Sequence, residues 1–572
     1  MRVLWQYLKP YKKQLIVGPA FKLTEAVLEI LVPTIMAKYL IDIGIRNADS
    51  SYIFKTGALM LALAVIGLGC ALVCQYNASV ASQGFGTKLR SAVYEKITSL
   101  SFKELDRFGS ATLLNRITGD INILQQSVAM IIRLVIRAPF IVLGSFVMAS
   151  IINIKLGLII LGTAPIFALV IFLIMRKTIP LYGKIQKKLD KLTNVAAESF
   201  DGVRVIRAFA KKKNELEKFE MSANEFSALS IHVGKISAIL NPATLLVLNF
   251  LIISVLWAGG VQVNSGSMTK GDIIAVTTYI SYIMTAMLVV ADLIILFIRA
   301  GVAKDRVCEL LQTESELKEG CQNSVFESES VLEFKNVSFS YNGEENALDS
   351  VSFELKNGES LGIIGGIGSG KTTVVNLICR FFDADSGEVR LFGRNIKDYR
   401  FKTLRSLVGV AMQKPFIFSG TVKSNILQGK PNASDSELLK AAEISQALEF
   451  IEKLDDGFDS VTEAEGRNLS GGQKQRLSLA RAIIAESPVL VLDDSCSALD
   501  YSTELKFRKA LKEQYHGALI MVSQRVSTIK DCSKILVLED GKLSGIGTHE
   551  ELLNNNEDYK LIYTSQTKRE VE

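Results

Sequence analysis

The sequence predicts two domains of different fold class, an all-α transmembrane domain of six helical spans and an α/β domain that follows it. Three observations lead to this prediction. Long uncharged apolar runs recur through the first half of the chain. After Arg299 the pattern changes to short apolar strands that alternate with helical segments, as in α/β folds. In that second half, a glycine-rich loop joins one of the strands to a helix.

Length and composition agree with a chain of mixed character. The 572 residues include 65 basic and 59 acidic side chains, 22% are charged, and the mean hydropathy is +0.27. The chain is too apolar for a disordered protein and too charged to lie wholly within a membrane. A net charge of +6 over this length does not indicate nucleic acid as a partner. The seven cysteines form no C-x-x-C pair, so neither a disulfide framework nor a zinc site is expected.

Five uncharged runs account for most of the predicted spans: 56–87, 138–154, 156–175, 236–269 and 273–291. Most of them supply the ~20 apolar residues that cross a ~30 Å hydrocarbon core, whereas runs of about 10–14 residues are more typical of buried core helices. A sixth run, from residue 15 to about 40, is less apolar because it carries Lys22, Glu25, Glu29 and Lys38. We count it as the first span, since an even number of spans leaves both ends of the chain on one side.

The connections at 84–127 and 176–235 are long and rich in Lys and Arg, whereas the opposite connections hold few basic residues. This asymmetry predicts a multi-pass membrane protein whose long connections and two termini face the cytoplasm. Both connections keep helical spacing with little Pro or Gly, so we expect the membrane helices to continue beyond the bilayer. The alternative is a pair of unstructured basic loops that bind anionic lipid.

A few ionisable residues lie within the predicted spans. Glu25 and Glu29 share one helical face, Arg133 and Arg137 repeat that spacing, and Asp292 lies late in the sixth span. Because charge at such depth is costly, these groups normally face a bundle interior or a water-filled cavity. Two interpretations remain open: mutual pairing, or contact with a substrate. Glu25, Glu29 and Asp292 are the substrate candidates, and they hint weakly at a cationic cargo.

A polar stretch separates the two domains. We expect the transmembrane domain over 1–310, a linker over 311–330 and the α/β domain over 331–572. The glycine-rich loop follows the apolar strand 360–364 and precedes the helical run 373–380, which is the context of a phosphate-binding loop. The candidate cofactor-binding residues of this loop are Gly365, Gly366, Ile367, Gly368, Ser369, Gly370, Lys371, Thr372 and Thr373.

The residues of the loop fit the chemistry of a P-loop NTPase. Backbone N–H groups of the glycines surround phosphate oxygens, Lys371 reaches the β- and γ-phosphates, and Thr372 offers its hydroxyl to Mg²⁺. Downstream, the apolar strand 489–492 ends in Asp493, a carboxylate placed to hold Mg²⁺ through water. The expected cofactors are therefore ATP and Mg²⁺.

A second anion site lies between these two motifs. Leu469 precedes a serine and two glycines that open a helix from Lys474 to Ala485, so free N–H groups and the helix dipole favour negative charge there. By itself, this pattern is ordinary helix capping. When it follows a P-loop and precedes a strand that ends in aspartate, as it does here, it is highly specific. The binding residues expected at this site are Ser470, Gly471, Gly472 and Gln473.

With these motifs, nearly the whole chain resembles the ATP-binding cassette (ABC) exporters. The shared features are six spans, long intracellular extensions and one nucleotide-binding domain. The resemblance implies that two nucleotide-binding domains meet head to tail, so the signature Leu469 to Gln473 of one completes the ATP site of the other. It also implies that Tyr341 stacks on adenine and that Gln413 senses Mg²⁺ and the attacking water. Residues 497–500 would form the loop that crosses the dimer.

The intracellular extensions carry the same resemblance. Residues 108–116 and 198–209 are similar to the segments beside the family's coupling helices, which dock on the nucleotide-binding domains, the second on that of the partner. Their apolar residues also fit a helix–helix core, which is the competing interpretation.

Two positions depart from the family pattern. The family places a glutamate after the strand that ends in Asp493, where this chain has Asp494, one methylene shorter. The family places a histidine in a Val-Ser-His-Arg turn, where this chain has Gln524. Since a displacement of ~1 Å can cost ~10²-fold in rate, we expect poor activation of water at this chain's own P-loop. Glutamine can hydrogen-bond a γ-phosphate but cannot hold a proton near neutral pH.

Both departures fall in one composite site, and Ser470 to Gln473 stay intact. This pattern favours a heterodimer: the chain holds ATP in a degenerate site and lends its signature to the hydrolytic site of a second half-transporter. The expected function is ATP-driven export of amphiphilic small molecules, drugs or lipids, as in multidrug efflux from a bacterial cytoplasmic membrane. A homodimeric exporter with slow hydrolysis and an ATP-gated regulatory membrane protein remain as alternatives. An importer energiser is disfavoured, because importers usually carry the two domains on separate chains.

Overall fold

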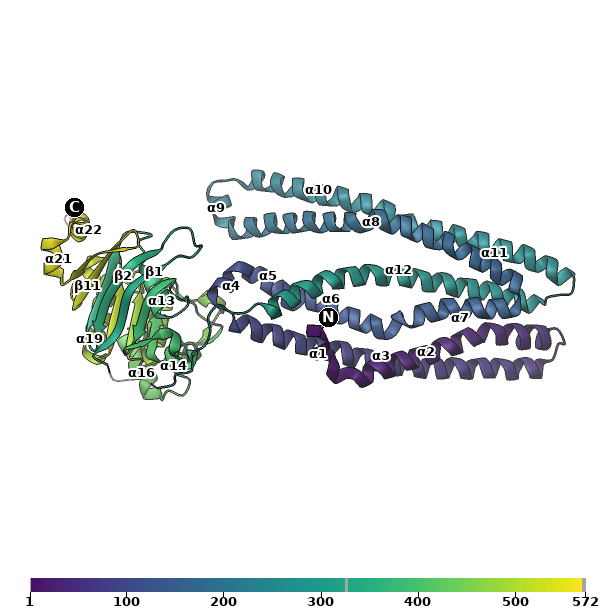
Figure 1. Cartoon of the computed structure of the whole chain (residues 1–572), viewed down its shortest axis with the longest axis horizontal. Coiled ribbons are helices and arrows are strands. Elements are labelled where there is room, and N and C mark those ends of the chain that lie inside the picture. The colour runs from purple at the N-terminus through teal and green to yellow at the C-terminus, as the bar shows by residue number, and fades with distance from the viewer. Residues whose placement is uncertain (1, 325–327, 568–572) are drawn as a thin grey trace. The chain divides into compact units, whose positions relative to one another are not determined.

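The computed structural model describes residues 2–324 and 328–567. Two compact units make up the chain: Met1–Ser99 with Phe108–Thr313, and Leu100–Arg107 with Glu314–Glu572. The first unit consists of long helices and the second contains all the described β-sheet (Figure 1). The fold class is therefore the predicted one, a helical membrane domain followed by an α/β domain.

The first unit is built from helices joined by short turns. Asn153 begins one of them, because its side chain accepts hydrogen bonds from the backbone N–H groups of Lys155 and Leu156. Another begins at a capping box in which Thr269 and Asp272 bond each other's backbone. The helices are α1 Arg2–Leu8, α2 Lys12–Ile35, α3 Ser50–Ser99, α5 Ser110–Asn115, α6 Ile121–Met130, α7 Arg137–Ile152, α8 Ile154–Asp201, α9 Val203–Ala208, α10 Lys212–Ala238, α11 Leu240–Asn264 and α12 Lys270–Gln312.

In the described part of the chain, five helical segments are long and apolar enough to span a membrane: Ser50–Ser99, Ser110–Ile152, Ile154–Asp201, Lys212–Asn264 and Lys270–Gln312. They contain the runs 56–87, 156–175 and 273–291 completely, and the runs 138–154 and 236–269 over most of their length. At 1.5 Å per residue the 50 residues of α3 extend roughly 75 Å, far more than a ~30 Å core requires. That the helices continue beyond the bilayer stays a prediction, for which these lengths are sufficient.

The sixth expected span lies on α2 and its π-helical continuation Met36–Ile45. Its charged side chains exclude it from the segments that qualify by composition. It nevertheless packs as part of the bundle: the Tyr279 hydroxyl on α12 donates to the carbonyl of Ile30 at 2.7 Å and lies 2.7 Å from the Thr34 hydroxyl. Tyr279 is completely buried, so this contact joins α2 to α12 in the core of the unit.

The second unit contains two main sheets. A mixed sheet has the order β12 Lys542–Gly547, β11 Lys534–Glu539, β3 Ser360–Gly365, β10 Ala518–Val522, β9 Val489–Asp493 and β6 Val408–Ala411, parallel except for the β11–β12 pair. An antiparallel sheet has the order β2 Leu348–Lys356, β1 Ser330–Phe339, β4 Ser386–Leu391 and β5 Arg394–Asn395. A short pair, β7 Gly420–Thr421 and β8 Val461–Thr462, completes the strands.

Helices cover these sheets. They are α4 Phe102–Phe108, α13 Lys371–Ile378, α14 Phe401–Leu407, α15 Val422–Leu427, α16 Asp435–Ile444, α17 Leu448–Ile451, α18 Gly471–Ile484, α19 Tyr501–Gln514, α20 Val526–Ile529, α21 His549–Asn555 and α22 Glu557–Thr567. Strand β9 is buried along its whole length, which explains its uninterrupted apolar sequence. Since the carboxyl ends of parallel strands meet at one sheet edge, the ends of β3, β9 and β10 lie side by side there.

Helix α4 belongs largely to the second unit, although its sequence precedes most of the membrane helices. The Phe102 ring packs on the Phe381 ring with 4.6 Å between centroids. Lys103 forms an ion pair with Glu316 at 2.8 Å, and the backbone N–H of Glu316 donates to the Glu104 carboxylate. Residues 100–107 thus pack as part of the α/β unit.

Candidate nucleotide-binding site

The loop between β3 and α13 needs glycine at two positions for steric reasons. A Cβ on Gly365 would lie 2.2 Å from the carbonyl oxygen of Leu538, and one on Gly370 would lie 2.6 Å from that of Ala347. Gly370 also has a φ of +95°, which L side chains rarely adopt. The resulting tight turn leads directly into the first turn of α13, where unpaired N–H groups favour an anion.

The Lys371 ammonium lies over this loop. It donates to the carbonyls of Gly365 and Gly366 at 3.0 and 2.5 Å and to the Ser369 hydroxyl at 3.3 Å. Burial lowers the pKa of Lys371, while Asp494 and Asp493 oppose that shift. A half-buried cation within a glycine loop is suited to a ligand that carries several negative charges.

One cleft brings together most of the residues predicted from sequence. Ser470 to Gln473 do not line it, nor do Gly365 and Gly366, which contact Lys371 instead. The predicted residues that line the cleft are Tyr341, Ile367, Gly368, Ser369, Gly370, Lys371, Thr372, Thr373, Gln413, Asp493, Asp494 and Gln524. Residues far apart in the sequence therefore share one concave surface.

Two adjacent carboxylates form the floor of the cleft. Asp493 is only 3% exposed, and burial raises its pKa to about 6, with Asp494 raising it further and Lys371 lowering it. Asp494 has a φ of +44°, and its backbone N–H donates to the carbonyl of Val522 at 2.9 Å. Burial also raises the pKa of Asp494, opposed by a 3.4 Å hydrogen bond that the Gln413 amide donates.

The oxygen atoms of this floor fit Mg²⁺. Thr372 contributes a hydroxyl, Asp493 a carboxylate and Gln413 an amide, all of them hard ligand types that Mg²⁺ accepts together with phosphate and water. A divalent cation next to Asp493 would compensate the cost of burying its charge. The residues present are therefore those that would hold the ion of a Mg²⁺–nucleotide complex.

Tyr341 is held at the other end of the cleft. Its hydroxyl lies 3.3 Å from that of Thr373 and accepts a 3.0 Å hydrogen bond from Asn376 on α13. Phe339 and Phe382 pack edge-on against its ring, yet the residue is 42% exposed. An anchored ring with an open surface is suited to stacking on a base. The contribution of Asn376 could not be anticipated, because only the fold brings α13 beside Tyr341.

The signature segment opens α18 with a complete capping box. The Ser470 hydroxyl accepts from the backbone N–H of Gln473, and the Gln473 side chain accepts from the backbone N–H of Ser470 at 2.8 Å. Both Ser470 and Gly471 are exposed at the surface. The segment does not line the cleft that contains Lys371.

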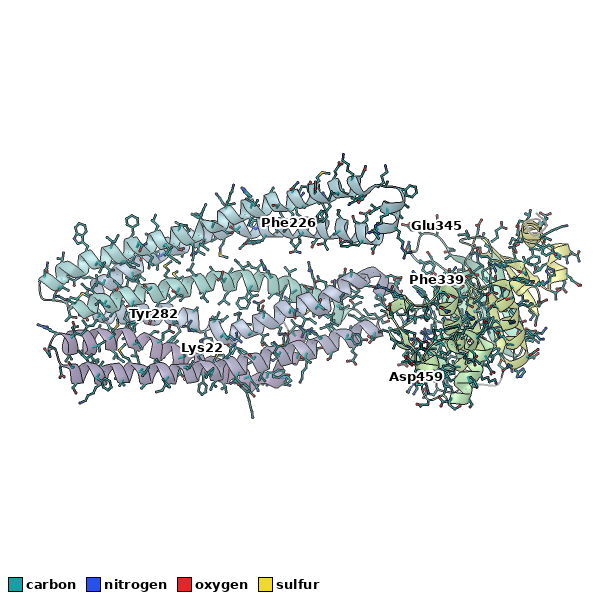
Figure 2. All side chains as sticks on the ribbon, turned by 180° about the vertical axis from the view of Figure 1, so that it is seen from behind. Lys22, Phe226, Tyr282, Phe339, Glu345 and Asp459 are labelled. Atoms are coloured by element: carbon teal, nitrogen blue, oxygen red, sulfur yellow. The ribbon has the colours of Figure 1, made fainter. Side chains whose placement is uncertain are left out.

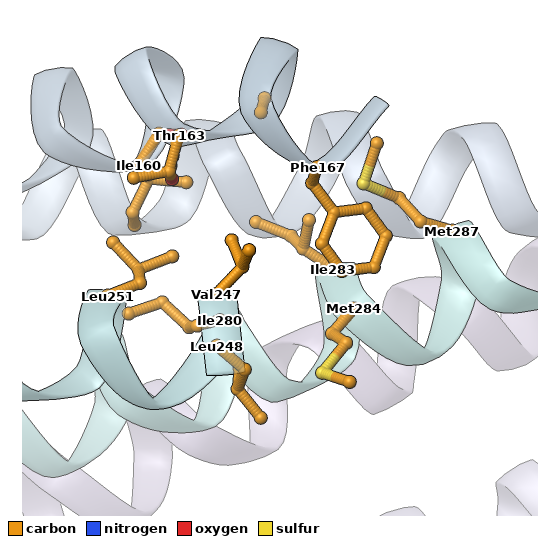
Figure 3. A pocket seen from close by; sticks show the side chains of 11 residues that line it. Ile160, Thr163, Phe167, Val247, Leu248, Leu251, Ile280, Ile283, Met284 and Met287 are labelled. Carbon is orange, nitrogen blue, oxygen red and sulfur yellow. Dashed lines mark hydrogen bonds between the residues drawn. The ribbon is translucent and has the colours of Figure 1, made fainter. Parts of the chain in front are cut away.

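Some of the ionisable residues predicted within the spans form pairs. Lys22 contacts Glu25 and Arg137 contacts Glu29, each at 2.7 Å, whereas Asp292 is exposed. The Glu29–Arg137 pair lines a small cavity together with Tyr282, which Figure 2 labels along with Lys22. A second, apolar cavity is shown in Figure 3 and is lined by Ile160, Thr163, Ala164, Phe167, Val247, Leu248, Leu251, Ile280, Ile283, Met284 and Met287.

Comparison with known proteins agrees with this geometry. Residues 15–287 match the ABC transporter transmembrane region and residues 348–497 match the ABC transporter family. YfiB of Bacillus subtilis, an uncharacterised ABC transporter ATP-binding protein, is 35% identical over 100% of this chain and 99% of its own length. An ATP-dependent lipid A-core flippase of Pasteurella multocida is 30% identical over 98% of this chain and 97% of its own. The chain therefore belongs to the ABC transporter family.

A solved structure supports the fold over both domains. A bacterial Atm1-family ABC exporter with ATP bound superimposes with a TM-score of 0.81, at 22% identity, over 99% of each chain. The fold of both domains is therefore shared with this solved structure.

The glycine loop generates a first prediction. Gly365→Ala places a methyl group against the backbone of Leu538, so it should destabilise the α/β unit by about 1–3 kcal/mol. Gly366→Ala is the matched control, because its Cβ would meet nothing within 4 Å. Thermal unfolding of the purified full-length protein measures both. Equal melting temperatures for the two variants would contradict the steric account of this loop.

Proposed function

We propose that this chain is one subunit of an ATP-driven exporter for amphiphilic small molecules, drugs or lipids. In this proposal the chain's own cleft holds MgATP and hydrolyses it poorly, while Ser470 to Gln473 complete the ATP site of a partner half-transporter. The observation that carries the proposal is the residue at position 494. An aspartate stands where an activating carboxylate has to reach a water molecule in front of the terminal phosphate.

The geometry around Asp494 supports weak hydrolysis. Its backbone is tied to strand β10 by the hydrogen bond to Val522, and its side chain accepts from Gln413, so it cannot easily move forward. One methylene is about 1.5 Å of reach, and a misplacement of ~1 Å is enough to cost ~10²-fold in rate. Lys371, Thr372 and Asp493 retain what ATP binding requires.

A heterodimer explains why both departures from the family pattern, Asp494 and Gln524, affect the same step, the hydrolysis of ATP. Asp494 and Gln524 line the same cleft, whereas the signature keeps its glycines and its capping serine. A partner with glutamate and histidine at the equivalent positions would use this chain's signature for turnover. The competing function is that of a homodimeric exporter with slow hydrolysis. A lipid A-core flippase is among the relatives, so this alternative is tested as well.

Two short helices are proposed to transmit the ATP cycle to the membrane domain. Helix α4 packs on the α/β unit of its own chain through Phe102 and Phe381. Helix α9 and its flanks expose large apolar side chains, among them Phe209, which is 71% exposed. Exposed apolar residues at the tip of a helical pair are typical of a contact surface, and here the α/β unit of the partner is the proposed contact.

Side chains around two cavities of the membrane domain are suited to an amphiphilic cargo. The apolar cavity of Figure 3, at about 30 Å³, would have to open to admit such a molecule, and its Phe167, Met284 and Met287 side chains can adapt to irregular apolar shapes. The cavity lined by the charged pair Glu29–Arg137 also offers the Tyr282 hydroxyl. Glu25 and Glu29 each have a cationic partner at 2.7 Å, but of the two only Glu29 lines this cavity. Glu29, which lines the cavity, and Asp292, which is exposed, are therefore the better candidates for contact with a charged part of the substrate.

Restoring the missing groups tests the proposed weakness of the site. Asp494→Glu combined with Gln524→His should raise ATP turnover at this chain's own P-loop about 10²-fold, because the longer carboxylate regains its reach. Asp494→Asn is the control, since it keeps the size of aspartate but removes the base. Turnover is measured on the purified transporter. An unchanged rate in the double variant, at normal ATP affinity, would refute the account of the weak site.

Neutralising Glu29 tests the proposed charged contact. In vesicles, Glu29→Gln should lower ATP-dependent transport of a cationic amphiphile relative to a neutral one by roughly 10- to 150-fold, the cost of one charged hydrogen bond. Glu25→Gln is the matched control on the same helix face. Unchanged selectivity in Glu29→Gln, with transport intact, would remove Glu29 from the substrate site.

A further inference from the structure

The C-terminal helix α22 contacts the turn that carries Gln524. The Gln566 side-chain amide donates to the carbonyl oxygen of Gln524 at 2.7 Å. Its carbonyl oxygen accepts from the backbone N–H of Val526 at 2.8 Å. One side chain therefore satisfies a backbone acceptor and a backbone donor on the two sides of Arg525, as a neighbouring β-strand would.

The rest of α22 does not depend on Gln566 for its position. Tyr559 at the start of the helix is completely buried, and Ile562 and Tyr563 pack against the core of the α/β unit. The Tyr559 hydroxyl also forms a 2.7 Å hydrogen bond with His549. Since these contacts already dock the helix, the two hydrogen bonds of Gln566 act chiefly on the turn.

The turn has other supports on both sides of Gln524. The Ser523 N–H donates to the carbonyl of Ile363, which holds the end of β10. The Arg525 N–H donates to the Ser523 hydroxyl at 3.0 Å, the Arg525 carbonyl accepts from the Thr528 N–H, and the Arg525 guanidinium lies 3.5 Å from the buried Glu504 carboxylate. Among the described residues, the hydrogen bond that Gln524 itself makes is the one that its backbone carbonyl accepts from Gln566. The direction in which the exposed Gln524 enters the cleft therefore depends in part on α22.

We propose that Gln566 is a positioning residue for the terminal phosphate of ATP, acting through the backbone of the Gln524 turn. The inference rests on the proposed assignment of Gln524 to the γ-phosphate. With the turn held, the Gln524 amide is presented to that phosphate at little entropic cost. Without the two hydrogen bonds of Gln566, here called the clamp, the turn samples more conformations, and the contact between the Gln524 amide and the γ-phosphate weakens. The affinity for ADP, which has no γ-phosphate, does not depend on the clamp.

The test compares the affinities of ATP-like and ADP ligands in the full-length purified transporter. Competition with a fluorescent nucleotide measures the binding of AMP-PNP, which is not hydrolysed, and of ADP, both with Mg²⁺. Gln566→Ala should weaken AMP-PNP about three- to tenfold and leave ADP unchanged. Gln566→Glu should weaken AMP-PNP at least as much, because its carboxylate cannot donate to the Gln524 carbonyl.

Thr567→Ala is the matched control, since the Thr567 hydroxyl bonds only to the Tyr563 carbonyl of its own helix. It should leave both affinities unchanged. Equal weakening of AMP-PNP and ADP in Gln566→Ala would overturn the proposal, because it would indicate a purely structural role. An unchanged affinity ratio in both Gln566 variants would overturn it as well.

Gln524→Ala separates this inference from the proposed function. If Gln524→Ala changes the affinity ratio and the Gln566 variants do not, the clamp is refuted and the phosphate contact stands. If Gln524→Ala leaves the ratio unchanged, the assignment of Gln524 to the γ-phosphate fails, and the clamp fails with it. The use of AMP-PNP makes both results independent of the hydrolysis rate.

Discussion

The chemistry of this chain depends on the parallel pairing of three strands, β3, β10 and β9. Their register places the start of the glycine loop, Asp493 and the turn after Val522 at one sheet edge. The backbone hydrogen bond from Asp494 to Val522 extends that pairing by one residue and thereby fixes where the next carboxylate begins. With its starting point fixed, the reach of this carboxylate depends mainly on side-chain length, which is why the proposed function attaches weight to one methylene.

In the proposed function, different residues at this sheet edge serve the binding of ATP and its hydrolysis. In that function, Lys371, Thr372 and Asp493 would act on charge that is present in the bound nucleotide, and their positions follow from the fold of the loop and β9. Asp494 and Gln524 would act on the attacking water and the terminal phosphate, where small displacements are costly. A cleft can therefore keep its affinity for ATP while it loses its rate, and the intact capping box of α18 remains available to another chain.

Local sequence was sufficient for the parts whose information is local. The glycine loop, the buried strand before Asp493 and the uncharged runs can each be recognised from their own consecutive residues. Each lies in the predicted kind of element. Contacts between distant segments were not predictable. Residues 100–107 pack with the α/β unit because Phe102 meets Phe381, and nothing in the spacing of either segment indicates this. Asn376 beside Tyr341 and Gln566 beside Gln524 are of the same kind.

The nucleotide that remains in each pocket after one round of hydrolysis tests the central claim most directly. Purified transporter is loaded with radiolabelled, photoreactive ATP, allowed a single turnover, and crosslinked, and the label on each P-loop is then identified. The account predicts intact triphosphate on this chain's Lys371 loop after the opposite pocket has converted its nucleotide to diphosphate. Diphosphate appearing in both pockets at the same rate would contradict it.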